Sequence, residues 1–249
     1  MIKKHYFILF VLLFCKLNLF AQDYDEAPAW GGGADQYKFS PGFSLGYVSN
    51  SYKILKNANW RTPFIDPVTN KAVTSPLNSI TSSNLPGFSL GFLARYSLTP
   101  NIEARFSPSL IFADKQVIYT YTDASQNVTK QIQTTTFDFP LLLKLKSDRV
   151  GNYRGYAVGG LKYSLAIGKG NSNDANDVNP LDKQLKNNLG YASYEVGLGC
   201  DIYFEYFKLS PEIKLSNSFG NILVQDNTNY SSPLSKLFLH TFTVTLYFE

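Results

Sequence analysis

The 249-residue sequence is poor in charged side chains, since Lys, Arg, Asp and Glu make up only 17% of it. A soluble domain typically carries about 25%. Long apolar runs are also missing: no stretch of 18 apolar residues occurs, which excludes an α-helix that spans a bilayer. Aromatic residues are abundant instead, at 15% of the chain. They favour β-strands, so the composition predicts an all-β protein.

Cysteine and histidine are scarce, with two residues of each in the chain. Beyond residue 21 only Cys200 and His240 remain, so no intrachain disulfide can form there. A Ser-His-Asp triad needs a histidine beside its nucleophile, and His240 shares its strand face with apolar residues. One cysteine and one histidine are too few ligands for a zinc site. No glycine-rich phosphate-binding turn leads into a helix. We therefore expect no catalytic residues, no metal, no cofactor and no small-molecule substrate.

The N-terminus has the three parts of a secretory signal peptide. Two lysines give residues 1–21 a positive start, residues 6–14 form an apolar stretch, and residues 19–21 form a cleavage site. An uncleaved membrane anchor is the alternative. Lys16 interrupts an apolar stretch that is already too short for an anchor. The pattern therefore predicts a signal peptide over 1–21.

Export changes the charge of the mature chain. The formal net charge is +4, but the first 21 residues hold three lysines and no acid, which leaves 20 basic against 19 acidic residues. This balance argues against a nucleic-acid partner, because little cationic excess remains to displace counterions from phosphates. Residues 22–37 have no clear period and are expected to form a periplasmic N-terminal extension, ahead of one β-barrel over 38–249.

Apolar and polar residues alternate with a period of two along much of the chain, the pattern of strands with one apolar face. In 86–98, for example, Phe88 and Leu90 alternate with Ser89 and Gly91. A soluble β-sandwich also alternates, but its polar face would have little need of the glycine that accompanies the charges here. Strands are expected near 39–48, 86–98, 101–119, 132–147, 153–168, 191–205, 207–216 and 238–248.

The lengths of the connections alternate as well. Short turns are expected around 98–101, 148–152 and 205–206, and long connections at 49–85, 120–131, 169–190 and 217–237. Outer-membrane barrels have short periplasmic turns and long extracellular loops. The sequence therefore predicts an all-β, eight-stranded antiparallel up-and-down barrel that crosses a bacterial outer membrane and contacts its lipid.

The polar strand faces place many charges inside such a barrel, whose bore is just wide enough for its own side chains. These residues are Arg95, Glu103, Arg105, Asp138, Lys144, Lys146, Arg154, Lys162, Glu195, Asp201, Lys208, Glu212 and Lys214. Because buried charges are costly unless they are paired, we predict an ion-pair network with some trapped water that plugs the lumen. The excess of bases leaves a small anion channel as the alternative.

Two blocks of sequence carry a family resemblance. The first contains Phe139-Pro140-Leu141-Leu142-Leu143-Lys144, Lys146-Ser147, Arg149, Gly151-Asn152-Tyr153 and Gly159-Gly160. The second contains Tyr194-Glu195-Val196-Gly197-Leu198-Gly199, Asp201-Ile202-Tyr203-Phe204-Glu205-Tyr206-Phe207-Lys208 and Ser210-Pro211. Shorter matches are Pro86-Gly87-Phe88 and Tyr247-Phe248-Glu249. Together they resemble PorT, also called SprT, an outer-membrane component of the type IX secretion system of Bacteroidetes. The first and final long loops depart from the family's pattern.

The resemblance implies a non-catalytic accessory role in outer-membrane protein export, and in gliding where that machinery is present. The partners would be other components of the secretion system. The candidate contacts are the N-terminal extension and the turns at 148–152 and 205–206. The alternative is a structural or adhesive barrel that binds its partners through the long extracellular loops.

Overall fold

In the computed structural model, residues 35, 37–65, 70–132, 135–167, 185, 187–226 and 228–249 are described. The expected signal peptide, most of the extension and most of the 169–190 connection lie outside these residues. The regular secondary structure of the described chain consists of strands and one short 3-10 helix at Ala124–Gln126. No helix in it is long and apolar enough to cross a membrane.

The strands fall into two sheets. The large sheet contains β1 (Phe39–Lys56), β3 (Leu85–Thr99), β4 (Ile102–Phe106), β5 (Ser109–Ala113), β8 (Thr135–Lys146), β9 (Tyr153–Ile167), β10 (Gly190–Tyr203), β11 (Lys208–Ser218) and β12 (Leu234–Phe248). The small sheet contains β2 (Leu77–Thr81), β6 (Lys115–Tyr121) and β7 (Val128–Ile132).

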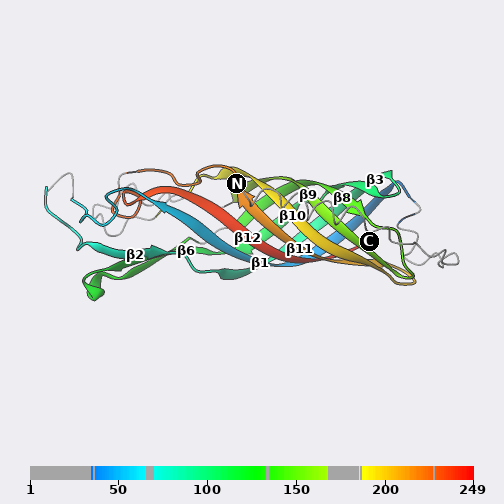
Figure 1. The fold of residues 1–249 in the computed structure, drawn as a ribbon, viewed down its shortest axis with the longest axis horizontal. Coiled ribbons are helices and arrows are strands. Elements are labelled where there is room, and N and C mark those ends of the chain that lie inside the picture. The colour runs from blue at the N-terminus through cyan, green and yellow to red at the C-terminus, as the bar shows by residue number, and fades with distance from the viewer. Residues whose placement is uncertain are drawn as a thin grey trace, which may run out of the picture.

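The large sheet closes into a ring (Figure 1). Its strands follow the order β1-β12-β11-β10-β9-β8-β4-β3-β5, and additional pairings of β1 with β3 and of β8 with β5 complete the closure. β4 and β5 share one place between β3 and β8. The ring is therefore an eight-stranded antiparallel up-and-down barrel. Closure removes the free edges at which an open sheet would expose unpaired N–H and C=O groups.

The third barrel strand is interrupted where the sequence predicts one strand over 101–119. Pro108 has no N–H to donate to a ladder, and its carbonyl oxygen accepts a hydrogen bond of 3.0 Å from the Phe92 amide. Beyond Ala113 the chain leaves the ring, and β6 pairs with β2 and β7 instead. The prediction of a single strand is therefore wrong, because Pro108 and the exit from the ring divide the segment into β4, β5 and β6.

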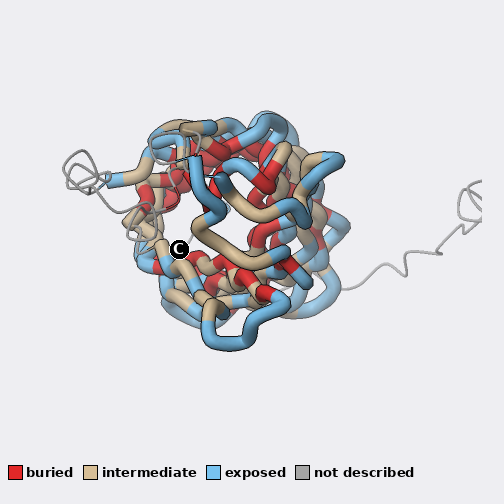
Figure 2. Tube along the Cα trace, turned by 90° about the vertical axis from the view of Figure 1, so that its left-hand side faces the viewer, coloured by how far each residue is buried: buried red, intermediate tan, exposed pale blue. Residues whose placement is uncertain are grey.

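Side chains alternate between the two faces of the barrel. Phe92, Leu141 and Leu198 point outward and are 73%, 63% and 69% exposed, whereas Arg95 and Arg105 on the inner face have no exposed surface. Figure 2, a view from the side that carries the long loops, shows the strands as a ring. This arrangement is the reverse of a soluble protein, in which large apolar side chains are inside and charges outside.

The two ends of the barrel differ. One, which we call the turn end, carries the short connections 99–102, 146–153 and 203–208, together with the start of β1 and the finish of β12. The other, which we call the loop end, carries the small sheet and the long connections (Figure 1, left). The alternation of short and long connections that the sequence predicts is thus present in the fold.

Three connections that the sequence predicts as loops contain strands. β1 continues to Lys56 and pairs with β12 from Leu234 onward, while β2 and β7 lie within the expected connections 49–85 and 120–131. The polarity of the barrel inverts here: Tyr52 on the inner face is buried, whereas Lys53 on the outer face is exposed. The expectation failed because it followed one polarity of alternation along the whole chain.

An apolar core lies inside the loop end. It packs the extended part of β1 and β12 against the small sheet and the neighbouring loops. Its buried members are Tyr52, Leu77, Ile80, Val117, Tyr119, Tyr121, Leu185, Ile222, Leu223, Tyr230, Leu234, Leu237 and Leu239. Tyr119 contributes a hydrogen bond of 2.8 Å from its hydroxyl to the Tyr230 carbonyl oxygen. The core therefore packs together segments that the sequence alone predicts to be loops.

Gly199 provides a test of packing inside the barrel. It pairs with Tyr156 on the neighbouring strand, and a Cβ at this glycine would collide with the Tyr156 ring. Since overpacking costs about 1–3 kcal/mol, Gly199→Ala is expected to lower the stability of the folded barrel in urea unfolding followed by circular dichroism. Gly155→Ala is the matched control, because its nearest neighbour would be the Ser147 hydroxyl at 3.9 Å. Equal stability of the two variants would contradict this account of the lumen.

Candidate functional site

The lumen at the turn end holds a group of linked ion pairs, which we call the turn-end cluster. Its members are Asp35, Arg95, Glu103, Lys144, Lys146, Arg154, Asp201, Lys208 and Glu249. Arg95 is central: its Nε lies 2.5 Å from Glu249 Oε2 and its Nη1 lies 3.0 Å from Glu103 Oε1. Glu103 Oε1 also lies 2.5 Å from Lys146 Nζ. The cluster therefore joins β3, β4 and β8 to the end of the chain.

A second group, the central cluster, lies further along the lumen. It contains Arg105, Asp138, Lys162, Glu195, Glu212 and Lys214. Arg105 Nη1 lies 2.7 Å from Glu212 Oε2, and both side chains have no exposed surface. Lys162 Nζ lies 2.9 Å from Asp138 Oδ2 and 3.0 Å from Glu195 Oε1. Lys214 bridges Glu195 and Glu212 at 3.7 Å from each. Arg105 on β4 and Glu212 on β11 thus pair across the lumen, whereas the other pairs lie between neighbouring strands or along β11.

Tyrosine rings fill the space between the two clusters. Lys144 Nζ lies 3.8 Å from the centroid of the Tyr156 ring, and Arg105 Cζ lies 5.3 Å from the same centroid. Arg105 also lies 4.9 Å from the Tyr247 ring, whose hydroxyl is 3.0 Å from Lys214 Nζ. Cations over aromatic faces are attracted by the ring quadrupole. The rings therefore pack the lumen and link the clusters.

The structure places the sequence-predicted lumen residues in these two clusters, and twelve of the thirteen are buried. Arg154 is the exception, at the mouth, with 17% of its side chain exposed. Two acids that sequence reasoning missed, Asp35 and Glu249, also take part. With them the clusters hold eight cationic and seven anionic side chains. The excess of bases that favours an anion channel is thereby nearly removed.

One small polar cavity lies beside the central cluster. Its volume is about 20 Å³, and Ser107, Asp138 and Glu195 are among its lining residues. Ser107 Oγ, Asp138 Oδ1 and Glu195 Oε2 have no hydrogen-bond partner among the described residues. A cavity of more than about 10–15 Å³ can hold one water molecule. This space fits a single trapped water, as a plugged lumen requires.

Asp35 covers the mouth of the lumen at the turn end. Its carboxylate lies 3.2 Å from Lys208 Nζ and 3.4 Å from Arg154 Nη1, and it accepts a hydrogen bond from the Tyr203 hydroxyl. Burial alone would raise the pKa of this carboxyl, but Lys208, Tyr203 and the neighbouring cations together lower the pKa well below its ordinary value. Asp35 is therefore ionised at neutral pH and remains paired.

Two hairpin turns form a continuous surface around this mouth. The Tyr203 amide donates to the Asn152 carbonyl oxygen at 2.9 Å, and Arg149 Cζ lies 3.9 Å from the Tyr203 ring centroid. Val150 and Tyr206 project from the two turns and are 58% and 81% exposed. We call the turns 148–152 and 204–207 together the turn-end surface. They belong to the β8–β9 and β10–β11 hairpins, which adjoin through the pairing of β9 with β10.

A family model described as an outer membrane protein beta-barrel domain matches residues 20–224 of the chain. The chain belongs to this family. The barrel therefore lies in the outer membrane, and in such barrels the short turns face the periplasm and the long loops the cell surface. No curated protein matches the chain.

Several solved outer-membrane proteins are similar in structure. OprG from Pseudomonas aeruginosa has 12% sequence identity and a TM-score of 0.43, with 84% of this chain and 93% of OprG covered. Neisserial surface protein A has 7% identity and a TM-score of 0.43, with 85% and 98% covered. The attachment invasion locus protein Ail of Yersinia pestis has 10% identity and a TM-score of 0.33, with 84% and 96% covered.

The residues considered for catalysis lie apart from the lumen clusters. His240 is partly exposed and stands opposite Ser51 and Asn217 in the barrel wall. Cys200 is a free, partly exposed thiol. Among the residues that the structure describes, no three His, Cys, Asp or Glu side chains are grouped so that they could hold a metal ion.

The Arg105–Glu212 pair predicts a non-additive stability cycle. Removing one partner of a buried ion pair costs about 3–5 kcal/mol, whereas replacing both partners by apolar residues is often neutral. Arg105→Met and Glu212→Leu should each lower the unfolding free energy in lipid by about that amount, and the double variant should recover most of the loss. Additive losses in urea titrations would show that the pair contributes no coupling.

The packed lumen predicts that the protein forms no stable open pore. The purified protein, inserted into planar bilayers, should give no resolved single-channel steps, because paired charges and tyrosine rings occupy the barrel interior. A porin run under the same conditions serves as the positive control. Reproducible conductance steps with anion selectivity would favour the channel alternative.

Proposed function

We propose that this barrel is a non-catalytic accessory of type IX protein secretion, with a role like that of PorT, and that it binds other secretion components through its turn-end surface. In this proposal the mature protein lacks residues 1–21, which serve as a cleaved signal peptide. Residues 22–37 form a periplasmic N-terminal extension. The proposal combines the sequence resemblance with the arrangement of the residues that carry it.

The observation that carries the proposal is the contact between the two turns. The blocks that resemble PorT, 139–160 and 194–211, are separate in sequence, but their turns touch through Asn152 and Tyr203. Val150 and Tyr206 expose apolar surface on the two turns. Exposed tyrosine is typical of protein interfaces. A periplasmic partner would therefore find both resemblance blocks on one surface.

The filled lumen supports a binding role over a transport role. Charged side chains in the two clusters are paired inside the barrel, so opening a path would expose several unpaired charges at once, which is costly. The proposed role therefore places contacts at the ends of the barrel. The absence of catalytic function is part of the proposal and rests on the sequence beyond residue 21, where His240 is the one histidine.

A structural or adhesive role through the loop end is the second candidate. It is favoured by the apolar core and by the small sheet β2-β6-β7, which together make the cell-surface end an ordered unit. Such a surface is suited to recognition outside the cell. The two candidates use opposite ends of the barrel, so variants at each end separate them.

Deletion of the gene tests the first candidate. Loss of the protein should abolish release of type IX cargo into the medium and its proteolytic maturation, and the wild-type gene should restore both. Tyr206→Asp at the turn end should fail to restore them, because it places a charge on the exposed aromatic contact. Phe219→Asp is the matched control, since Phe219 is 58% exposed near the loop end.

Assembly of each variant is checked by its heat-dependent shift on gels. Normal cargo secretion in the deletion strain would refute the proposal. If Tyr206→Asp restores secretion and Phe219→Asp does not, the loop end is the functional surface.

A further inference from the structure

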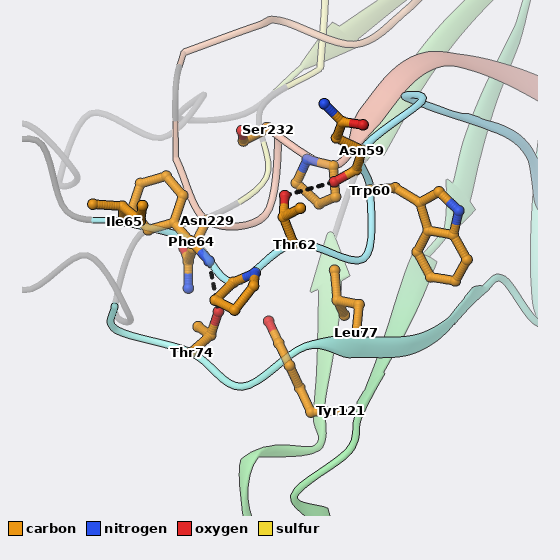
Figure 3. A pocket seen from close by; sticks show the side chains of 12 residues that line it. Asn59, Trp60, Thr62, Phe64, Ile65, Thr74, Leu77, Tyr121, Asn229 and Ser232 are labelled. Carbon is orange, nitrogen blue, oxygen red and sulfur yellow. Dashed lines mark hydrogen bonds between the residues drawn. The ribbon is translucent and has the colours of Figure 1, made fainter. Parts of the chain in front are cut away.

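A cavity of about 230 Å³ lies in the loop end (Figure 3). Its floor includes Leu77, Tyr121, Asn229 and Pro233, all of which are buried. The first long connection and the β11–β12 connection meet here, and the amide of Asn57 donates a hydrogen bond of 3.0 Å to the Pro233 carbonyl oxygen. The floor is therefore built from ordered parts of the apolar core.

The rim of the cavity is open to the cell exterior. Asn59, Thr62, Ile65 and Ser232 line the cavity and are exposed. A buried floor beneath an exposed rim gives a small molecule access from outside the cell. Pockets that bind drug-sized ligands have volumes of about 300–1,000 Å³, so this smaller cavity suits one ring-sized molecule.

Asn229 is the unusual residue of the floor. Only 2% of it is exposed, and neither its Nδ2 nor its Oδ1 has a hydrogen-bond partner among the described residues. Its turn is firmly held, since the Thr228 amide donates to Ser231 Oγ and the Ser231 amide donates to Thr228 Oγ1, each at 3.1 Å. A buried amide without partners costs free energy. A ligand with both a donor and an acceptor would satisfy it.

Besides the Asn59 amide on the rim and an indole N–H, the other polar side chains that line the cavity are hydroxyls. Figure 3 shows the Tyr121 hydroxyl directed into the space between Thr74 and Leu77. Thr74 Oγ1 accepts from the Phe64 amide at 3.1 Å and retains its own proton, while Thr62 Oγ1 donates to the Asn59 carbonyl oxygen at 2.7 Å and can still accept. Burial raises the pKa of Tyr121 to about 12, so its hydroxyl is neutral. The cavity thus offers several donors and acceptors.

The residues that line the cavity carry no charge. Its apolar surface comes from Phe64, Ile65, Leu77, the prolines and the Trp60 ring, which also has Lys56 Nζ 4.1 Å from its centroid. A ligand that fits must be neutral, rich in hydroxyl groups that donate and accept, and must have an apolar C–H face. These properties belong together in a sugar ring.

We propose that this cavity binds a neutral monosaccharide unit at the cell surface, with the Asn229 amide pairing with ring hydroxyls. The sugar comes either free in solution or as part of a membrane glycan. The site is at the opposite end of the barrel from the turn-end surface, so it does not depend on the proposed role in secretion.

Binding is tested on the full-length mature protein, in a detergent without a sugar headgroup. Saturation-transfer difference NMR and calorimetry measure binding of D-glucose, D-galactose and D-mannose, with glucuronate as the charged probe. At least one neutral sugar should bind, and glucuronate should bind more weakly. Lipopolysaccharide in nanodiscs then competes with the free sugar. Competition identifies a membrane glycan as the source, and its absence identifies a soluble sugar.

Asn229→Leu keeps the side-chain volume and removes the amide. It should weaken sugar binding by about tenfold or more, since two hydrogen bonds are lost, without lowering the thermal midpoint. Asn78→Leu is the matched control, because Asn78 is exposed on β2 next to the cavity. Tyr121→Phe, which removes one hydroxyl, should give a smaller loss. No binding of any neutral sugar, equal binding by Asn229→Leu, or preference for glucuronate would each overturn the proposal.

Discussion

The fold depends on pairing charges that the closed ring removes from water. An outer-membrane barrel satisfies its backbone by closure, but an eight-stranded ring leaves an interior that its own side chains must fill. Here that interior is filled by two ion clusters with tyrosine rings between them. Each cation of the two clusters lies within 4 Å of a carboxylate, so its burial is offset by attraction and hydrogen bonding. Most of these pairs join neighbouring strands, and the Arg105–Glu212 pair joins β4 to β11 on the opposite side of the ring.

Glycine and tyrosine complete this packing. Gly199 leaves the space in which the Tyr156 ring lies, and that ring in turn contacts Lys144 and Arg105. The mixture of glycine with charges on the polar strand faces therefore has a steric origin. A small residue on one strand admits a large one from the next, as close packing requires. The lumen is packed by complementary sizes as well as by charge.

Strand assignment from the sequence is correct for the part of the barrel that lies within the membrane and wrong for the part beyond it. Inside the bilayer the outer face must be apolar, so residues such as Phe88 and Leu90 repeat with a period of two. Past the membrane the outer face meets water and the inner face meets an apolar core, so Tyr52 points inward and Lys53 outward. A prediction that assumes an apolar outer face along the whole chain therefore assigns this segment to a loop. Asp35 gives no signal at all, because its role arises from contacts with residues distant in sequence.

The charge clusters also determine whether binding at one end of the barrel affects binding at the other. Transmission of a signal between distant sites requires an element with two alternative arrangements that both sites influence. The lumen provides none among its described residues: Arg105, Glu212 and Lys214 are held by buried pairs, and separating them would leave unpaired charges. A partner at the turn end and a ligand at the loop end would therefore act independently. We therefore expect the closed, ion-paired barrel to hold one surface at its turn end and another at its loop end without coupling between them.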